Sequence, residues 1–155
     1  MLEPHSLLES QLPEPSPHVS LQRALREQQT LLDSAGVGIV FLRQRCVVRC
    51  NQRYAEIFGY AHPDQLKALV TQAFYPSREA FRELGQAAYP VLTQGGTYRE
   101  ERRLRRRDGT LFWASLAGRL INPHDTSEGS IWTVDDIDAQ RRSQAALVSL
   151  VLSAM

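Results

Sequence analysis

The sequence predicts an α+β domain whose antiparallel sheet carries its helices on one face. One observation is a hairpin signal, Asp108-Gly109, between a polar strand expected at 97–107 and an apolar strand expected at 110–121. Glycine supplies the positive φ that a tight hairpin turn needs. The other is the element order: a helix, two strands, several short helices, three strands and a last helix. Short helices inserted between two groups of strands are typical of this class.

The N-terminal part predicts a flexible leader followed by an amphipathic helix. Four prolines within residues 1–17 oppose regular structure, so this stretch is expected to be mobile. Apolar side chains at helical spacing then predict a helix at 18–34, which ends before two glycines. Its leucines are candidates for a dimer surface: Leu21, Leu25 and Leu32.

The next elements are two short strands, expected at 37–42 and 46–50, with Gln44-Arg45 at the turn between them. Asn51 is placed to cap a helix at 52–58, because its side-chain oxygen can accept a bond from a free amide of the first turn. This helix is expected to turn its aromatic residues inward and to end at Gly59.

Two further helices are expected before the hairpin. Pro63 suits the first position of a short helix that runs to Leu69, and Ser77 suits the cap of a longer one at 78–93. Pro90 lies inside the longer helix, where it removes a backbone hydrogen bond, so a kink or partial break is predicted there.

The C-terminal part predicts a strand at 129–134, an Asp-rich corner and an amphipathic helix at 139–154. A narrow stripe at three- and four-residue steps favours a parallel two-helix coil and therefore a homodimer: Ile137, Gln144, Leu147 and Val151. The helix resembles an output element of a longer protein.

The charge and hydropathy of the sequence argue against nucleic acid and membranes as binding partners. A net charge of +1 gives no overall field for nucleic acid or an anionic membrane. The arginines at 99–107 are interrupted by Glu100 and Glu101 and divided between two strand faces, so no nucleic-acid binding is expected. No stretch approaches the roughly 20 apolar residues of a membrane span, and no signal peptide is evident, so a cytoplasmic location is expected. A span elsewhere in a longer parent protein stays open.

Several motifs, in this order, resemble the PAS sensory domains: Ala35-Gly36-Val37-Gly38-Ile39-Val40, Arg49-Cys50-Asn51-Gln52-Arg53-Tyr54, Phe58-Gly59-Tyr60, Arg105-Arg106-Arg107-Asp108-Gly109-Thr110 and Asp136-Ile137-Asp138. The last departs from the family's usual Asp-Ile-Thr. The resemblance implies a five-stranded antiparallel sheet in the order 2-1-5-4-3 around a small cavity. It also implies a core at 35–138 and the start of a signalling helix at 139–155.

The same resemblance implies a module of a larger bacterial signalling protein. Such a module senses a small ligand or a partner and passes a change through its C-terminal helix to an effector domain, such as a histidine kinase of a two-component system or a diguanylate cyclase. The alternative is a ligand-free dimerisation scaffold. The sequence shows no nucleophile–base pair, phosphate-binding loop or metal-ligand spacing, so an enzyme is the least favoured of the three functions.

Seven aromatic residues are candidates for a ligand pocket, because buried tyrosine and tryptophan offer apolar walls together with polar groups. They are Tyr54, Phe58, Phe74, Tyr75, Tyr89, Trp113 and Trp132. The competing interpretation is that these side chains fill the core and leave no room.

The cofactor stays unidentified. A haem would need an axial histidine on the long helix, and residues 78–94 contain none. Flavin photoreceptor relatives carry an Asn-Cys pair, whereas Cys50-Asn51 reverses that order at a strand end. Haem and covalent flavin are therefore disfavoured, while a non-covalent flavin or a small organic ligand remains open.

The corner that precedes the last helix is the predicted signal-transfer junction: Asp136, Ile137 and Asp138. We expect its carboxylates to cap the helix rather than to act in catalysis. We also expect one arginine of the 99–107 run to pair with Asp136, which would stiffen the connection between the sheet and the helix.

Overall fold

In this computed structural model, residues 16–34 and 36–155 are described, and the chain divides into two compact units, 1–34 and 35–155. The expected leader lies outside the described residues except for Ser16 and Pro17. The first unit contains α2 (Pro17–Ser34), so the helix begins one residue before the predicted position. Pro17 is tolerated because the first helical amide needs no partner, and the Ser16 hydroxyl accepts a bond from the Val19 amide.

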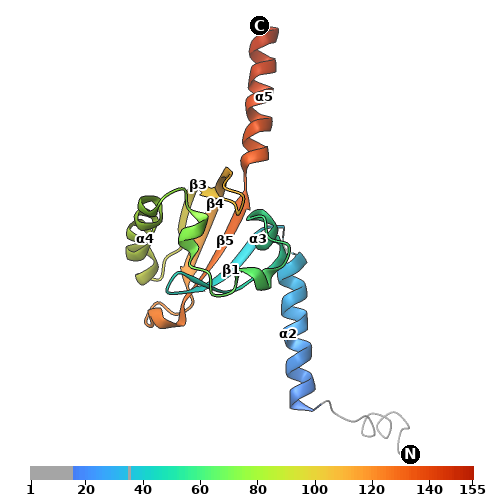
Figure 1. Cartoon of the computed structure of the whole chain (residues 1–155), viewed down its shortest axis with the longest axis vertical. Coiled ribbons are helices and arrows are strands. Elements are labelled where there is room, and N and C mark those ends of the chain that lie inside the picture. Colours follow the sequence, from blue (N-terminus) through green and yellow to red (C-terminus); the bar gives the residue numbers. More distant parts are fainter. Residues whose placement is uncertain (1–15, 35) are drawn as a thin grey trace, which may run out of the picture. The chain divides into compact units, whose positions relative to one another are not determined.

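The second unit is built on a five-stranded antiparallel sheet with the order β2-β1-β5-β4-β3, which confirms the predicted fold (Figure 1). Its strands lie within two residues of the predicted limits: β1 (Gly38–Arg43), β2 (Cys46–Cys50), β3 (Tyr98–Arg105), β4 (Leu111–Leu120) and β5 (Ser130–Asp136). The hairpin turn at Gly109 has φ 92°, as the sequence predicted.

Short helices connect the strands: α3 (Gln52–Ile57), η1 (Pro63–Leu66), η2 (Thr71–Phe74), α4 (Arg78–Thr93) and η3 (Thr126–Glu128). The helix predicted to reach Leu69 stops at Leu66, and η2 was not predicted. The caps at Asn51 and Ser77 are confirmed, since each side chain accepts a bond from the amide three residues later.

The partial break predicted at Pro90 is wrong, because α4 continues through it to Thr93, and the alternative, a kink, stays a prediction. Pro90 and Gln86 lie on the solvent side of the helix. The Gln86 carbonyl, which loses its bond to residue 90, can therefore accept one from water, and the helix persists.

One face of the sheet forms the core with the helices. In β4, Phe112, Ala114, Leu116 and Gly118 are buried, while the intervening residues are exposed or half-buried. Gly118 is required by packing, because a Cβ there would lie 2.2 Å from the Trp132 ring. Strand alternation thus selects the apolar face that closes over the interior.

Asn51 ties the first strand to α3. Its side chain is completely buried, and its Oδ1 accepts bonds of 2.9 Å from both the Ile39 and Tyr54 amides. Its Nδ2 donates to the Val37 carbonyl at 3.0 Å. One amide side chain therefore satisfies three backbone groups and fixes α3 against β1.

The chain leaves the sheet through α5 (Asp138–Ala154), one residue before the predicted start. Ile137 is 8% exposed and its amide donates to the Trp113 carbonyl, so it anchors the helix and does not extend the predicted stripe. Leu147 and Val151 of that stripe are exposed. Within the described residues, we find no helix with the length and apolar character to cross a membrane.

A candidate ligand cavity and its exit junction

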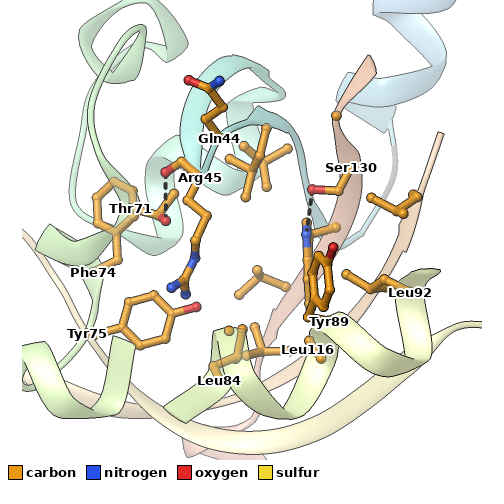
Figure 2. A pocket seen from close by; sticks show the side chains of 18 of the residues that line it. Gln44, Arg45, Thr71, Phe74, Tyr75, Leu84, Tyr89, Leu92, Leu116 and Ser130 are labelled. Carbon is orange, nitrogen blue, oxygen red and sulfur yellow. Dashed lines mark hydrogen bonds between the residues drawn. The ribbon is translucent and has the colours of Figure 1, made fainter. Parts of the chain in front are cut away.

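A cavity of about 200 Å³ lies between the sheet and α4, with α3 and η2 completing its wall (Figure 2). Its walls are mainly apolar and include Val40, Leu42, Leu84, Ala88, Leu92, Leu104, Leu116, Leu120 and Val134. An apolar cavity of about 150 Å³ is sufficient to bind benzene. Room therefore remains for a molecule of one ring and a few further atoms.

Six of the seven predicted aromatic residues line this cavity: Tyr54, Phe58, Phe74, Tyr75, Tyr89 and Trp132. Tyr54, Phe58 and Phe74 form a cluster with ring centroids 4.4–6.1 Å apart. Tyr89 is 63% exposed and lies at the rim. The interpretation that aromatic side chains leave no interior space does not hold for this core.

Trp113 is not brought to the cavity. It lies on the opposite face of β4, where Arg103 and Arg141 stack on its ring at 5.4 and 4.3 Å. The sequence pattern separated the two faces of this strand but did not show which one is interior. Trp113 instead contacts the first turns of α5.

Arg45 is the main polar group at the cavity, although its position in the sequence predicts only a turn. Gln44 and Arg45 have positive φ values of 50° and 62°, typical of a tight hairpin turn. The Arg45 side chain runs from this turn toward the ring hydroxyl of Tyr75 (Figure 2). Its Cζ lies 3.4 Å from the centroid of the Phe81 ring. Nothing in the local sequence pattern indicates this inward course.

Burial shifts the pKa values of the ionisable groups around the cavity. Desolvation raises the pKa of Tyr54 well above its usual value, and it also raises that of Tyr75, where the positive charge of Arg45 opposes the shift. Desolvation lowers the pKa of Arg45, against an opposing contribution from Tyr75. Both tyrosines are thus neutral hydroxyl groups at physiological pH.

The predicted junction contains an ion pair. Arg106 Nη2 lies 2.7 Å from Asp136 Oδ2, which confirms the expected arginine–Asp136 contact and identifies the arginine. The other Asp136 oxygen accepts a 3.0 Å bond from the Asp138 amide at the start of α5. Asp138 also pairs with Arg142 on the next turn, which lowers the Asp138 pKa.

Arg106 also connects this junction to the cavity wall. Its Nη1 donates to the Ile57 carbonyl, and the Arg107 amide donates to the Phe58 carbonyl at 2.8 Å. Phe58 lines the cavity. A continuous set of contacts therefore leads from the cavity, through the end of α3, to the first residues of α5.

Two features bear on metal binding and on covalent flavin chemistry: the grouping of possible metal ligands and the state of the Cys50 thiol. The described residues contain no cluster of three or more histidine, cysteine or acidic side chains that could bind a metal ion. Burial raises the pKa of the Cys50 thiol to about 12, with a further contribution from the charge of Asp64. This thiol therefore stays protonated, and its sulfur faces the Pro63 carbonyl at 3.9 Å.

Comparisons with known proteins agree with this geometry. A family model described as a PAS domain matches residues 26–89. The sensor protein TdiS of Thauera aromatica is 32% identical over 123 residues, which is 79% of this chain but 22% of that protein. This chain thus spans about a fifth of that relative.

Two solved structures extend the match. The PAS domain of a LuxR-family transcriptional regulator from Burkholderia thailandensis, in complex with ethanol, is 30% identical with a TM-score of 0.65, covering 70% of this chain and 96% of that one. A domain of a sensory box sensor histidine kinase/response regulator from Geobacter sulfurreducens is 22% identical, with a TM-score of 0.55. The match covers 74% of this chain and 94% of that one. With the strand order and the interior cavity described above, these matches show that the chain belongs to the PAS domain family.

Proposed function

We propose that this PAS domain senses a small organic molecule in its cavity and transmits binding to a C-terminal effector through α5. The observation that carries the proposal is the cavity itself: about 200 Å³ of space, mostly apolar, within the core. An apolar pocket with a few polar groups is the usual form of a small-molecule site. The ethanol complex of the Burkholderia thailandensis relative supports a ligand-binding role for this fold.

Transmission is proposed to run through Phe58, Arg106 and Asp136. A ligand that moves the end of α3 changes the position of the Ile57 carbonyl, to which Arg106 donates. Because the same guanidinium holds Asp136, the start of α5 responds. Coupling of this kind requires that the ligand binds one arrangement of the junction more tightly than another.

The effector is proposed to be a histidine kinase, because the Geobacter sulfurreducens structure is a domain of a sensor histidine kinase. The resemblance to PAS domains leaves a cyclic-di-GMP enzyme as the other proposed effector, and the parent protein is proposed to be cytoplasmic. The second candidate function is a ligand-free dimerisation scaffold. It is favoured by apolar side chains left exposed on α5, including Leu147, Leu150 and Val151, and on α2, including Leu21 and Leu25. The side chain of Leu32 lies outside the described set.

Filling the cavity separates these two functions. Ala88 is 2% exposed and lines the cavity from α4, so Ala88→Leu places three carbons into the space. We expect the variant to fold, with a gain of about 0.5–2 kcal/mol in the free energy of unfolding from the filled volume. Binding of benzoate, benzamide and benzyl alcohol at millimolar concentration, followed by amide chemical shifts, should be lost.

Ala87→Leu on the exposed side of the same helix is the matched control and should bind as the wild-type protein does. If none of the three compounds shifts cavity resonances in the wild-type protein, the sensory proposal fails and the scaffold remains. If Ala88→Leu binds them normally, the binding site lies elsewhere.

A further inference from the structure

The Arg45 side chain is half-buried, and one nitrogen of its guanidinium is enclosed by the protein. Among the buried side-chain polar atoms of the described residues, Arg45 Nη2 is the one without a hydrogen-bond partner. Among the described residues no carboxylate pairs with Arg45, whereas Arg102 pairs with Glu83 and Glu100, and Arg106 pairs with Asp136. Removing part of a charged group from water without a counterion costs free energy, so such a group is normally compensated.

The aromatic contacts around Arg45 compensate this charge only in part. A cation on a ring face contributes about 0.5–2 kcal/mol, and Phe81 provides such a face. Tyr75 offers a neutral hydroxyl. Stacking on a ring face does not use the in-plane N–H groups that bind carboxylates, and Nη2 keeps its N–H groups without a partner.

Helix α4 is shaped to admit this guanidinium. A Cβ at Gly85 would lie 2.9 Å from Arg45 Nη1, so the missing side chain provides the space that the cation occupies. Glycine in a helix interior costs roughly 0.5–1 kcal/mol relative to alanine. Gly85 therefore lowers the stability of α4 but leaves the space in which the Arg45 guanidinium lies beside the cavity.

An open groove on the surface adjoins the cavity at Arg45. The groove and the cavity share three lining residues: Arg45, Gly85 and Tyr89. Arg78 and Arg82 also line the groove, and no acidic residue is among its described lining residues. A basic approach of this kind attracts small anions toward the cavity.

On the basis of the proposed sensory function, we propose that the cavity ligand is a small organic anion, with an apolar body of about one ring in the cavity and a carboxylate bound by Arg45. The apolar walls bind the body, and the unpartnered Nη2 of Arg45 donates to the carboxylate. The available volume limits the ligand to about the size of benzoate.

The test compares three probes on the whole chain by amide chemical-shift titration: benzoate, its neutral isostere benzamide, and acetate, which lacks the apolar body. Benzoate should bind at least about tenfold more tightly than benzamide, because a charge-assisted bond is stronger than a neutral one. Acetate should bind more weakly than both, because it buries little apolar surface.

Arg45→Gln keeps a polar side chain at the same positive-φ position, but the side chain is two atoms shorter and carries no charge. It should weaken benzoate binding about ten- to a hundredfold and change benzamide binding less than about threefold. Arg82→Gln, which lines the groove but not the cavity, is the matched control and should leave benzoate within about threefold of wild type.

The outcomes separate the ligand class from the sensory function. If benzamide binds in the cavity as tightly as benzoate, or if Arg45→Gln leaves benzoate unchanged, the ligand is not an anion held by Arg45, but the sensory proposal stands. If neither benzoate, benzamide nor benzyl alcohol enters the cavity, both proposals are overturned.

Discussion

Replacing Asn51 with alanine is expected to lower the free energy of unfolding by about 3–5 kcal/mol. The change leaves the Ile39 and Tyr54 amides and the Val37 carbonyl without the partners that the side chain supplied. Each buried backbone group left unpaired costs roughly 1–3 kcal/mol, and partial access of water reduces the sum. Urea denaturation followed by circular dichroism measures the loss.

Asn122→Ala is the matched control, because the same side chain there accepts a bond from the His124 amide at an exposed turn. It should cost less than about 1 kcal/mol. If Asn51→Ala proves too unstable to purify, Asn51→Ser, which can still accept from the Tyr54 amide, should show an intermediate loss. Equal stability of the Asn51 and Asn122 alanine variants would show that Asn51 is not the tie between β1 and α3.

Replacing Asp136 with asparagine is expected to loosen the start of α5. The change keeps the size of the side chain but removes the charge that pairs with Arg106 at 2.7 Å. Both side chains are mostly shielded, with 25% and 19% exposed, so the pair is screened less than a surface pair. We expect a loss of about 1–2 kcal/mol in the free energy of unfolding, and faster hydrogen exchange in the first turn of α5.

A double-mutant cycle of Asp136→Asn with Arg106→Gln isolates the contribution of this contact. The double variant should lose about 1 kcal/mol less than the sum of the single variants, because each single change already removes the pair. Asp135→Asn, which changes the same charge on the other face of β5, should not couple to Arg106. Strict additivity of the first pair would remove Arg106–Asp136 from the proposed route.

Most of the fold could be predicted because its signals are local. Asp108-Gly109 requires a turn, Asn51 and Ser77 are caps, and strand alternation in β4 follows from side-chain chemistry. The site depends on contacts distant in sequence. The course of Arg45 over Phe81 is set by the glycine at position 85, forty residues later in the chain, and no local pattern encodes it.

Two of the wrong predictions, Trp113 in the cavity and a break at Pro90, have similar causes. Trp113 and Trp132 are both aromatic residues within strands, and only the assembled sheet shows that Trp132 packs over Gly118 while Trp113 meets the arginines outside. The break at Pro90 is predicted from the intrinsic effect of proline on a helix. The free-energy cost of the lost hydrogen bond, however, depends on whether Pro90 lies on the buried or the solvent side of α4. The solvent-facing position lowers that cost.

Hydrogen exchange of the whole chain with and without a cavity occupant tests the central claim most directly. The occupant is whichever of benzoate and benzamide binds more tightly, so the result does not depend on the ligand class. We predict that binding changes the protection of amides near Phe58 and in the first turn of α5, and that Asp136→Asn keeps the binding but loses the response in α5. Binding in the cavity with unchanged exchange in α5 of the wild-type protein would contradict the account.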